Sequence, residues 1–362
     1  MNKKHNGIIS IWKFLFMMLI VIFHGRSFAG TNDTILFAEG SIGVEFFFLV
    51  SGYLLAKSAL NKKDNCDNIG KETLVFIWKK IKAFAPYVII SYILIIIAHI
   101  CFGNLTIGKT VLSVWDPLLL GIAGFKQTKI NSVTWYLGAM LICMLIIYPL
   151  IRKHKYNYVY TIIPIILILV GGYLSYRYPH LRTPYAWDGL VYKGLLRAFL
   201  ELNLGAMLYP ISENIKKLAF SKFGKIFITI IEICGFLTPF IISQFITNGL
   251  KYDFVVLLIL SISVCLAFSE QTLELKVCSN KFFYFLEKFS LPICLLHIFI
   301  RVLLQNLSFI AQYNYLQIMS VYLLGTIVLS YIVMIIVEKI TKKNLLTKFF
   351  KSLFLTKQES KI

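Results

Sequence analysis

The chain has 362 residues, is 58% hydrophobic, carries a net charge of +20 and has a mean hydropathy of +0.75. Only 15% of its residues are charged, below the roughly 25% that is typical of soluble domains. A single soluble core cannot bury this much apolar surface, so the composition indicates a membrane protein.

Ten apolar stretches are long enough to cross a bilayer core as helices, which takes ~20 residues each. In chain order they are residues 8–28, 40–59, 83–102, 133–151, 158–176, 190–210, 224–246, 253–269, 287–308 and 316–338. The first stretch is longer than the apolar core of a signal peptide and contains Lys13 and His24, so we expect it to be a retained span.

The fold class we predict is all-α: a polytopic membrane helical bundle of about ten transmembrane helices. Residues 110–125 are too short to span and contain Asp116-Pro117, which favours a re-entrant or interfacial segment. We expect one membrane domain over residues 1–340. The basic segment 341–362 follows it and predicts a cytoplasmic tail that lies on the inner leaflet as an amphipathic helix.

The loops between these stretches differ in their content of Lys and Arg. With the N-terminus in the cytoplasm, 26 of the 37 Lys and Arg residues fall in segments that would lie inside, and seven in segments that would lie outside. Because cytoplasmic loops carry an excess of these residues, the split predicts that both termini are cytoplasmic. It also explains the net charge without a nucleic-acid partner, since basic loops face an anionic inner leaflet.

Two polar side chains interrupt the first stretch. Lys13 and His24 are eleven residues apart, which is about three helical turns, so they share one face and lie roughly 16 Å apart along the axis. They could form a functional face, with a cation towards the cytoplasm and an imidazole towards the outside. Alternatively, Lys13 reaches the headgroups and His24 ends the helix.

The second stretch brings a carboxylate into the membrane. Glu45 enters near the outer edge, at the depth expected for His24, where it could fix the tautomer of the imidazole. The alternative is that Glu45 only occupies the first turn of its helix, where a carboxylate suits the helix dipole. Gly43 and Gly52 would let neighbouring helices approach closely. Ser51 is better interpreted as a hydrogen-bonding residue between helices than as a nucleophile.

Two later stretches contain polar pairs spaced by four residues, which share a helix face. Arg197 and Glu201 could neutralise each other, or Arg197 could line a polar cavity and hold an anion. His297 and Arg301 repeat this spacing in the ninth stretch. Charged groups within membrane spans are costly and mark functional sites. The seven Cys residues include no CxxC pair, and we expect free thiols, no metal and no bound cofactor.

The sequence resembles the acyltransferase 3 family of bacterial membrane acyltransferases. The family's first helix carries Arg or Lys, ten residues and then His, as in IWKFLFMMLIVIFH, where Lys13 precedes His24. Its second helix carries a motif that GVEFFFLVSGYL at residues 43–54 matches almost completely. Weaker similarities follow in order in TWYLGAMLICMLIIYPLI, LLRAFLELNLGAMLYP and LEKFSLPICLLHIFI, at residues 134–151, 195–210 and 286–300. The chain departs from most members in having Lys13 where they have Arg.

The resemblance implies an enzyme that moves an acyl group, usually acetyl, from cytoplasmic acyl-coenzyme A to a hydroxyl of a cell-surface or lipid-linked glycan. It implies a multi-pass protein of the bacterial inner membrane, with these two substrates and the membrane lipids as partners. His24 would be the general base or a transient acyl carrier, and Glu45 would orient it. Further residues are expected to contact the donor or the acceptor: Lys13 at the donor phosphates, Arg197 at an anion or oxyanion, Trp135 and Tyr136 as an aromatic wall, Ser51 and His297.

Ten spans with buried charges would also suit a transporter or flippase of a lipid-linked glycan. That alternative does not explain why the two motifs of the first helices occur together at the family's spacing. The aromatic pair Trp135 and Tyr136 likewise has a simpler explanation, as residues of the membrane interface.

Overall fold

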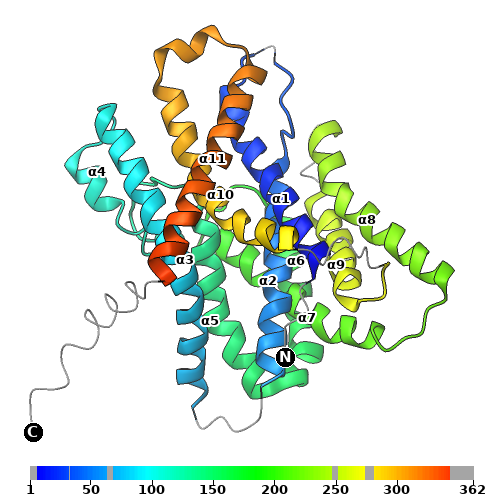
Figure 1. Ribbon diagram of the computed structural model, residues 1–362. Coiled ribbons are helices and arrows are strands. Elements are labelled where there is room, and N and C mark those ends of the chain that lie inside the picture. The colour runs from blue at the N-terminus through cyan, green and yellow to red at the C-terminus, as the bar shows by residue number, and fades with distance from the viewer. Residues whose placement is uncertain (1–5, 32, 63–67, 247–251, 274–280, 343–362) are drawn as a thin grey trace, which may run out of the picture.

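The chain forms a bundle of long helices in the computed structural model, which describes residues 6–31, 33–62, 68–246, 252–273 and 281–342 (Figure 1). The tail helix was predicted over residues 341–362, and its residues from 343 onward lie outside the described part of the chain. Helices α8 and α9 lie on one side of the bundle in the view of Figure 1, and α3 and α4 on the other.

The described residues form eleven α-helices, one short β-hairpin, a π-helix over Tyr158–Ile162 and several short 3-10 segments. The helices are α1 (Gly7–Gly25), α2 (Gly43–Leu60), α3 (Ile69–Cys101), α4 (Ile107–Leu112), α5 (Thr134–Asn157), α6 (Ile163–Arg177), α7 (Lys193–Ile215), α8 (Lys222–Phe245), α9 (Asp253–Ser269), α10 (Lys281–Asn306) and α11 (Tyr315–Lys342). Strands β1 (Trp187–Asp188) and β2 (Val191–Tyr192) pair antiparallel just before α7. The predicted all-α character is thus confirmed.

Each of the ten predicted stretches overlaps a helix, but seven helical segments of the described residues are long and apolar enough to cross a membrane. One of these segments, residues 134–177, contains both α5 and α6. The backbone at Lys155, near the end of α5, is non-helical (φ 49°, ψ −128°) and interrupts this segment. Helix α9 is one residue too short, with 17 residues. The multi-pass membrane fold is confirmed, whereas the count of ten spans and the orientation stay predictions.

Helices α1 and α10 run parallel to each other. Lys13 of α1 pairs with Glu287 of α10, and His24, eleven residues later, contacts Arg301, fourteen residues after Glu287. Parallel membrane helices need an odd number of crossings between them. The ten-span count places seven crossings between α1 and α10, so this packing favours that count.

Helix α3 begins earlier than hydropathy predicts, since the sequence indicated a span from residue 83 and a loop over residues 57–82. The side chain of Asn68 accepts a hydrogen bond from the Lys71 backbone N–H at 2.8 Å and caps the helix there. The first turns are polar, and Glu72 forms an ion pair with Arg152 of α5 at 3.1 Å. Hydropathy detects only the apolar part of such a helix, so it missed this extension.

The segment over residues 110–125 contains the end of α4, turns and one 3-10 turn rather than a span. Asp116 is buried and accepts hydrogen bonds from the backbone N–H groups of Ile130 (2.6 Å) and Asn131 (3.0 Å). Burial raises the pKa of the Asp116 carboxyl, while these two bonds oppose the rise. The Asn131 side chain in turn donates to the carbonyl oxygen of Leu295 at 3.0 Å, which anchors this segment to α10.

Helices α2 and α7 are in close contact through two glycines. A Cβ atom at Gly52 would overlap the carbonyl oxygen of Leu202, and one at Gly205 would overlap that of Leu49. Small residues allow membrane helices to approach in this way, as the sequence predicted for Gly52. Gly43 approaches α1 similarly, where a Cβ would lie 3.1 Å from Ile20.

Replacing Gly52 by Ala should therefore push α2 and α7 apart and destabilise the bundle by about 1–3 kcal/mol, the usual cost of overpacking. The matched control is Gly172→Ala in α6, where an added Cβ meets nothing within 4 Å. Thermal unfolding of the purified protein in detergent should show a lower midpoint for Gly52→Ala only. Equal midpoints for the two variants would contradict the close packing.

Candidate functional site

The first group of polar side chains, which we call the histidine cluster, consists of His24, His297 and Arg301. His24 lies in the last turn of α1, while His297 and Arg301 share a face of α10. The ring centroids of the two histidines are 5.1 Å apart, and Arg301 Nη1 lies 3.4 Å from His24 Nδ1. The helical spacing of α10 thus places both side chains against the imidazole of His24.

The hydrogen bonds of this cluster define which nitrogens carry protons. A guanidinium only donates, so His24 Nδ1 accepts from Arg301 and the proton of the neutral ring lies on Nε2. His297 Nδ1 donates to the carbonyl oxygen of Ile293 at 3.0 Å, which leaves Nε2 with a lone pair. Among the described residues, His297 Nε2 and Arg301 Nε are buried without a hydrogen-bond partner. Such groups are costly unless water or a substrate satisfies them.

The second group, the carboxylate cluster, consists of Glu45 of α2 with Arg197 and Glu201 of α7. Arg197 Nη2 lies 3.0 Å from Glu45 Oε1, and its Nε donates to Glu201 Oε1 at 2.7 Å. Arg197 Nη1 also donates to the Leu181 carbonyl oxygen at 3.4 Å. All three charged side chains are at most 3% exposed. The cluster ties α2 to α7 nearer the N-terminal end of α2 than the Gly52 contact does.

This arrangement differs from one expectation. Within the described part of the chain, Glu45 forms no hydrogen bond or ion pair with His24, which it was expected to orient. Arg197 contacts both neighbouring carboxylates, which agrees with the alternative that Arg197 and Glu201 neutralise each other. The physical reason is that a carboxylate in a low-dielectric interior is stabilised far more by a guanidinium than by a neutral imidazole. Arg301, not Glu45, contacts His24.

Lys13, at the other end of α1, forms an ion pair with Glu287 of α10. Ser10 also donates to Glu287, at 3.2 Å. Lys80 of α3 lies close enough to Lys13 to repel it electrostatically. Two lysines thus lie near each other at the end of α1 where the sequence predicts the donor phosphates to bind.

The remaining predicted residues lie around the carboxylate cluster. The Arg197 guanidinium carbon lies 5.8 Å from the centroid of the Trp135 ring. The ring of Tyr136 contacts that of Phe48, with 4.6 Å between the centroids. Ser51 Oγ lies 3.4 Å from the Tyr136 hydroxyl, which agrees with its interpretation as a hydrogen-bonding residue between helices. The two aromatic residues therefore pack against side chains of α2 and α7.

Sequence reasoning singled out His297 and Arg301 as a pair on one helix face but did not bring them to His24. It missed Glu287 and Asp253 entirely. Asp253, at the start of α9, accepts from the Leu181 backbone N–H at 2.7 Å and faces the carboxylate cluster electrostatically. Both residues stand near the ends of apolar stretches, where a carboxylate is easily taken for a loop residue. Their position at a span boundary was the one available signal.

Comparison with known proteins supports one family. The family model described as an acyltransferase domain, that of acyltransferase 3, matches residues 6–336, which is nearly the whole chain. No curated protein and no solved structure matches the chain.

Removing the cation from the carboxylate cluster should be severe. Arg197→Gln would leave Glu45 and Glu201 buried together without a counter-charge, and breaking a buried pair in this way costs about 3–5 kcal/mol. The matched control is Lys288→Gln, which breaks the exposed pair with Glu338 and should leave stability near that of the wild type. Size-exclusion profiles and thermal midpoints in detergent measure both. Equal behaviour of the two variants would argue against a structural role for Arg197.

Proposed function

The chain belongs to the acyltransferase 3 family, and from this premise we propose that it is a membrane O-acyltransferase. Its donor would be cytoplasmic acyl-coenzyme A, with acetyl as the expected acyl group. Its acceptor would be a hydroxyl of a cell-surface or lipid-linked glycan, and its location the inner membrane of a bacterium.

The observation that carries this proposal is the contact of His24 with Arg301 and His297. Acyl transfer to a hydroxyl needs a base for the hydroxyl proton and hydrogen-bond donors for the oxyanion that develops on the acyl carbonyl. The histidine cluster contains an imidazole together with a guanidinium whose Nε–H has no partner among the described residues. It offers both functions within one contact.

In the proposed reaction, His24 Nδ1 accepts the proton of the acceptor hydroxyl. The hydroxyl oxygen then forms an ester bond to the acyl carbon, the C–S bond of the thioester breaks, and the departing thiolate of coenzyme A takes the proton from the imidazolium. The 3.4 Å contact between Arg301 and Nδ1 is long for a hydrogen bond, so an incoming hydroxyl can displace it. Arg301 is then available to stabilise the oxyanion, the role first expected for Arg197.

His24 can also act as a transient acyl carrier through the same nitrogen. In that case Nδ1 attacks the acyl carbon, the C–S bond breaks and the thiolate of coenzyme A leaves. The acceptor hydroxyl then attacks the acyl carbon, the bond to Nδ1 breaks, and the hydroxyl proton passes to the thiolate. The sequence left these two roles open, and the geometry of the cluster suits both.

The donor would bind where Lys13 and Lys80 stand together. Lys and Arg hold phosphates as counter-charges, and coenzyme A carries several phosphate charges at the end far from its thioester. Lys13 and His24 lie on one face of α1 at opposite ends, so the anionic part of the donor would stay at one end and the reacting thioester would reach the other.

His24→Ala tests the base or carrier role. The loss of a general base typically lowers the rate by 10²–10⁴-fold, so acetyl transfer from acetyl-coenzyme A to the glycan should become nearly undetectable. Transfer by the purified protein is followed by mass spectrometry of the glycan. His154→Ala, which changes an exposed histidine at the end of α5, is the control and should keep full activity.

Near-normal glycan acylation by His24→Ala, at normal protein level, would refute the proposed mechanism. The flippase alternative would then be the better one. Because alanine is more welcome than histidine in a bilayer, poor membrane insertion is not expected for this variant.

Lys13 variants test the donor site. Lys13→Ala should raise the KM for acetyl-coenzyme A, whereas Lys13→Arg should keep it near the wild-type value, because Arg retains the charge and most family members have it there. Glu287→Gln separates two roles: it should lower this KM if Lys13 binds phosphate, and raise it if the Lys13–Glu287 pair only holds α1 to α10. Lys216→Ala, which removes an exposed lysine paired with Glu270, is the control.

A further inference from the structure

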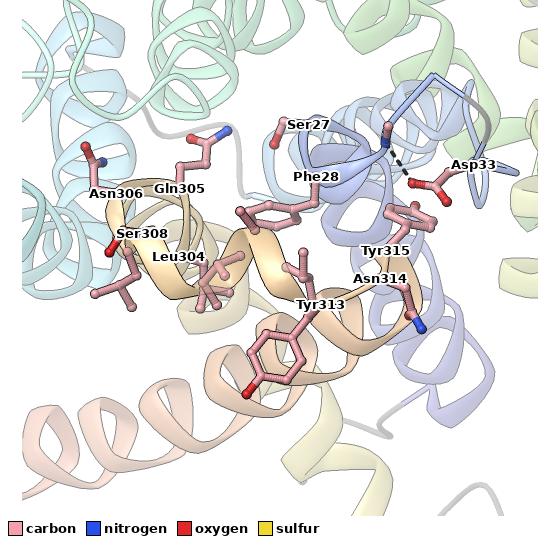
Figure 2. Close-up of a pocket in the computed structure, with 15 residues that line it drawn as sticks. Ser27, Phe28, Asp33, Leu304, Gln305, Asn306, Ser308, Tyr313, Asn314 and Tyr315 are labelled. Carbon is pink, nitrogen blue, oxygen red and sulfur yellow. Dashed lines mark hydrogen bonds between the residues drawn. The ribbon is translucent and has the colours of Figure 1, made fainter.

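A cavity of about 520 Å³ opens at the end of the bundle where α1 finishes and where α10 turns into α11. Figure 1 shows these segments together at the top of the view. One wall comes from Ser27, Phe28, Gly30 and Asp33 and the other from residues between 304 and 318, and Figure 2 shows the Phe28 side chain in the middle of the group. We call it the α10–α11 pocket. Its volume falls within the range of about 300–1,000 Å³ that is typical of ligand sites.

The lining of the α10–α11 pocket combines polar, aromatic and aliphatic side chains but contains no Lys, Arg or His. Asp33 is its one carboxylate, and it accepts a hydrogen bond from the Gly30 backbone N–H at 2.7 Å (Figure 2). Among the described residues, Gln305, Ser308 and Tyr313 have side-chain polar groups that make no hydrogen bond to the protein, so they are available to a ligand.

This chemistry suits a neutral polyhydroxylated ligand. Amide and carboxylate oxygens accept hydrogen bonds from hydroxyl groups, amide N–H groups donate to them, and aromatic rings pack against the apolar faces of sugar rings. A phosphate-bearing ligand such as coenzyme A would instead need cationic side chains. The pocket is therefore unsuited to the donor and suited to a sugar.

The pocket is adjacent to the histidine cluster. His297, Arg301 and Gln305 follow at intervals of four residues along α10, so they share a face, and each step advances about 6 Å along the axis. From the other wall, the Ser27 hydroxyl donates to the His24 carbonyl oxygen at 3.3 Å. The pocket thus begins about one helical turn beyond Arg301, at the end of α1 that carries His24.

We propose that the α10–α11 pocket is the acceptor subsite, which binds one or two neutral sugar units and presents a hydroxyl to His24. This inference rests on the proposed acyltransferase function and adds the position and chemical class of the acceptor site. The pocket lies at the end of α1 opposite to Lys13, so the two substrates approach from opposite ends of the same helix.

The kinetic test uses matched pairs of variants. Gln305→Ala and Tyr313→Ala should each raise the KM for the glycan at least about fivefold, the effect of losing one hydrogen bond of average strength. They should leave the KM for acetyl-coenzyme A unchanged. Gln312→Ala and Phe309→Ala are the controls, since both residues are exposed in the same segment but do not line the pocket.

A binding test is independent of catalysis. Ser308→Cys places a thiol in the pocket, and Gln312→Cys places one four residues away, outside it. The probe is the unacylated glycan purified from cells that lack this protein, added to membranes without any acyl donor. It should slow labelling by an impermeant maleimide at position 308 at least fivefold and leave position 312 unaffected. Acetyl-coenzyme A, tested as the anionic probe, should protect neither position.

The combined outcomes separate the two proposals. Protection at position 308 with an increased glycan KM supports the subsite. Protection without any transfer by the wild-type protein overturns the acyltransferase function and with it the acceptor role of the pocket, which would then only bind the glycan. Transfer by the wild type without protection, and with an unchanged glycan KM in Gln305→Ala and Tyr313→Ala, overturns the subsite alone. Equal protection of both cysteines also overturns it, because the glycan would then only coat the surface.

Discussion

The packing of the bundle depends on ion pairs that join helices distant in the sequence. Glu45 of α2 pairs with Arg197 of α7, and Lys13 of α1 pairs with Glu287 of α10. In the segments before α2 and α7, Glu39 pairs with Arg182. Leaving one of these groups unpaired would cost several kcal/mol, so the pairs determine which helices are neighbours and at what register. The apolar contacts around them, including the glycine contact of α2 with α7, complete a packing that these pairs already define.

Most of the fold could be predicted from hydropathy, since every predicted apolar stretch overlaps a helix. The start of α3 was missed for a physical reason. Helix α3 extends to Ile69 because of its cap at Asn68. This extension depends on polar residues at the helix end, and hydropathy averages over these positions. Helix α7 is absent from the seven segments that qualify by length and composition. It contains Arg197 and Glu201, the charged residues of the carboxylate cluster, and these lower its hydropathy.

For the candidate site, the sequence predicted what lies within one helix and missed what lies between helices. The spacing of Arg197 with Glu201, and of His297 with Arg301, correctly indicated shared faces. The assignment of Glu45 to His24 rested on equal depth in adjacent spans. The depth of a residue in the membrane does not determine which neighbouring helix its side chain faces, however. The Glu45 side chain faces α7 and pairs with Arg197. Knowing which helices are neighbours requires the three-dimensional packing, and one sequence without its relatives does not provide it.

The parallel packing of α1 and α10 has a consequence for biosynthesis. Lys13 and Glu287 are 274 residues apart, which corresponds to about 14–55 seconds of translation at typical rates. Throughout this interval the first helix sits in the membrane with its lysine and histidine lacking the partners that α10 supplies. The histidine cluster is therefore assembled among the last parts of the protein, when the ninth of the ten predicted spans inserts. A nascent chain that stalls before this point contains every residue of the two amino-terminal motifs and still has no completed site.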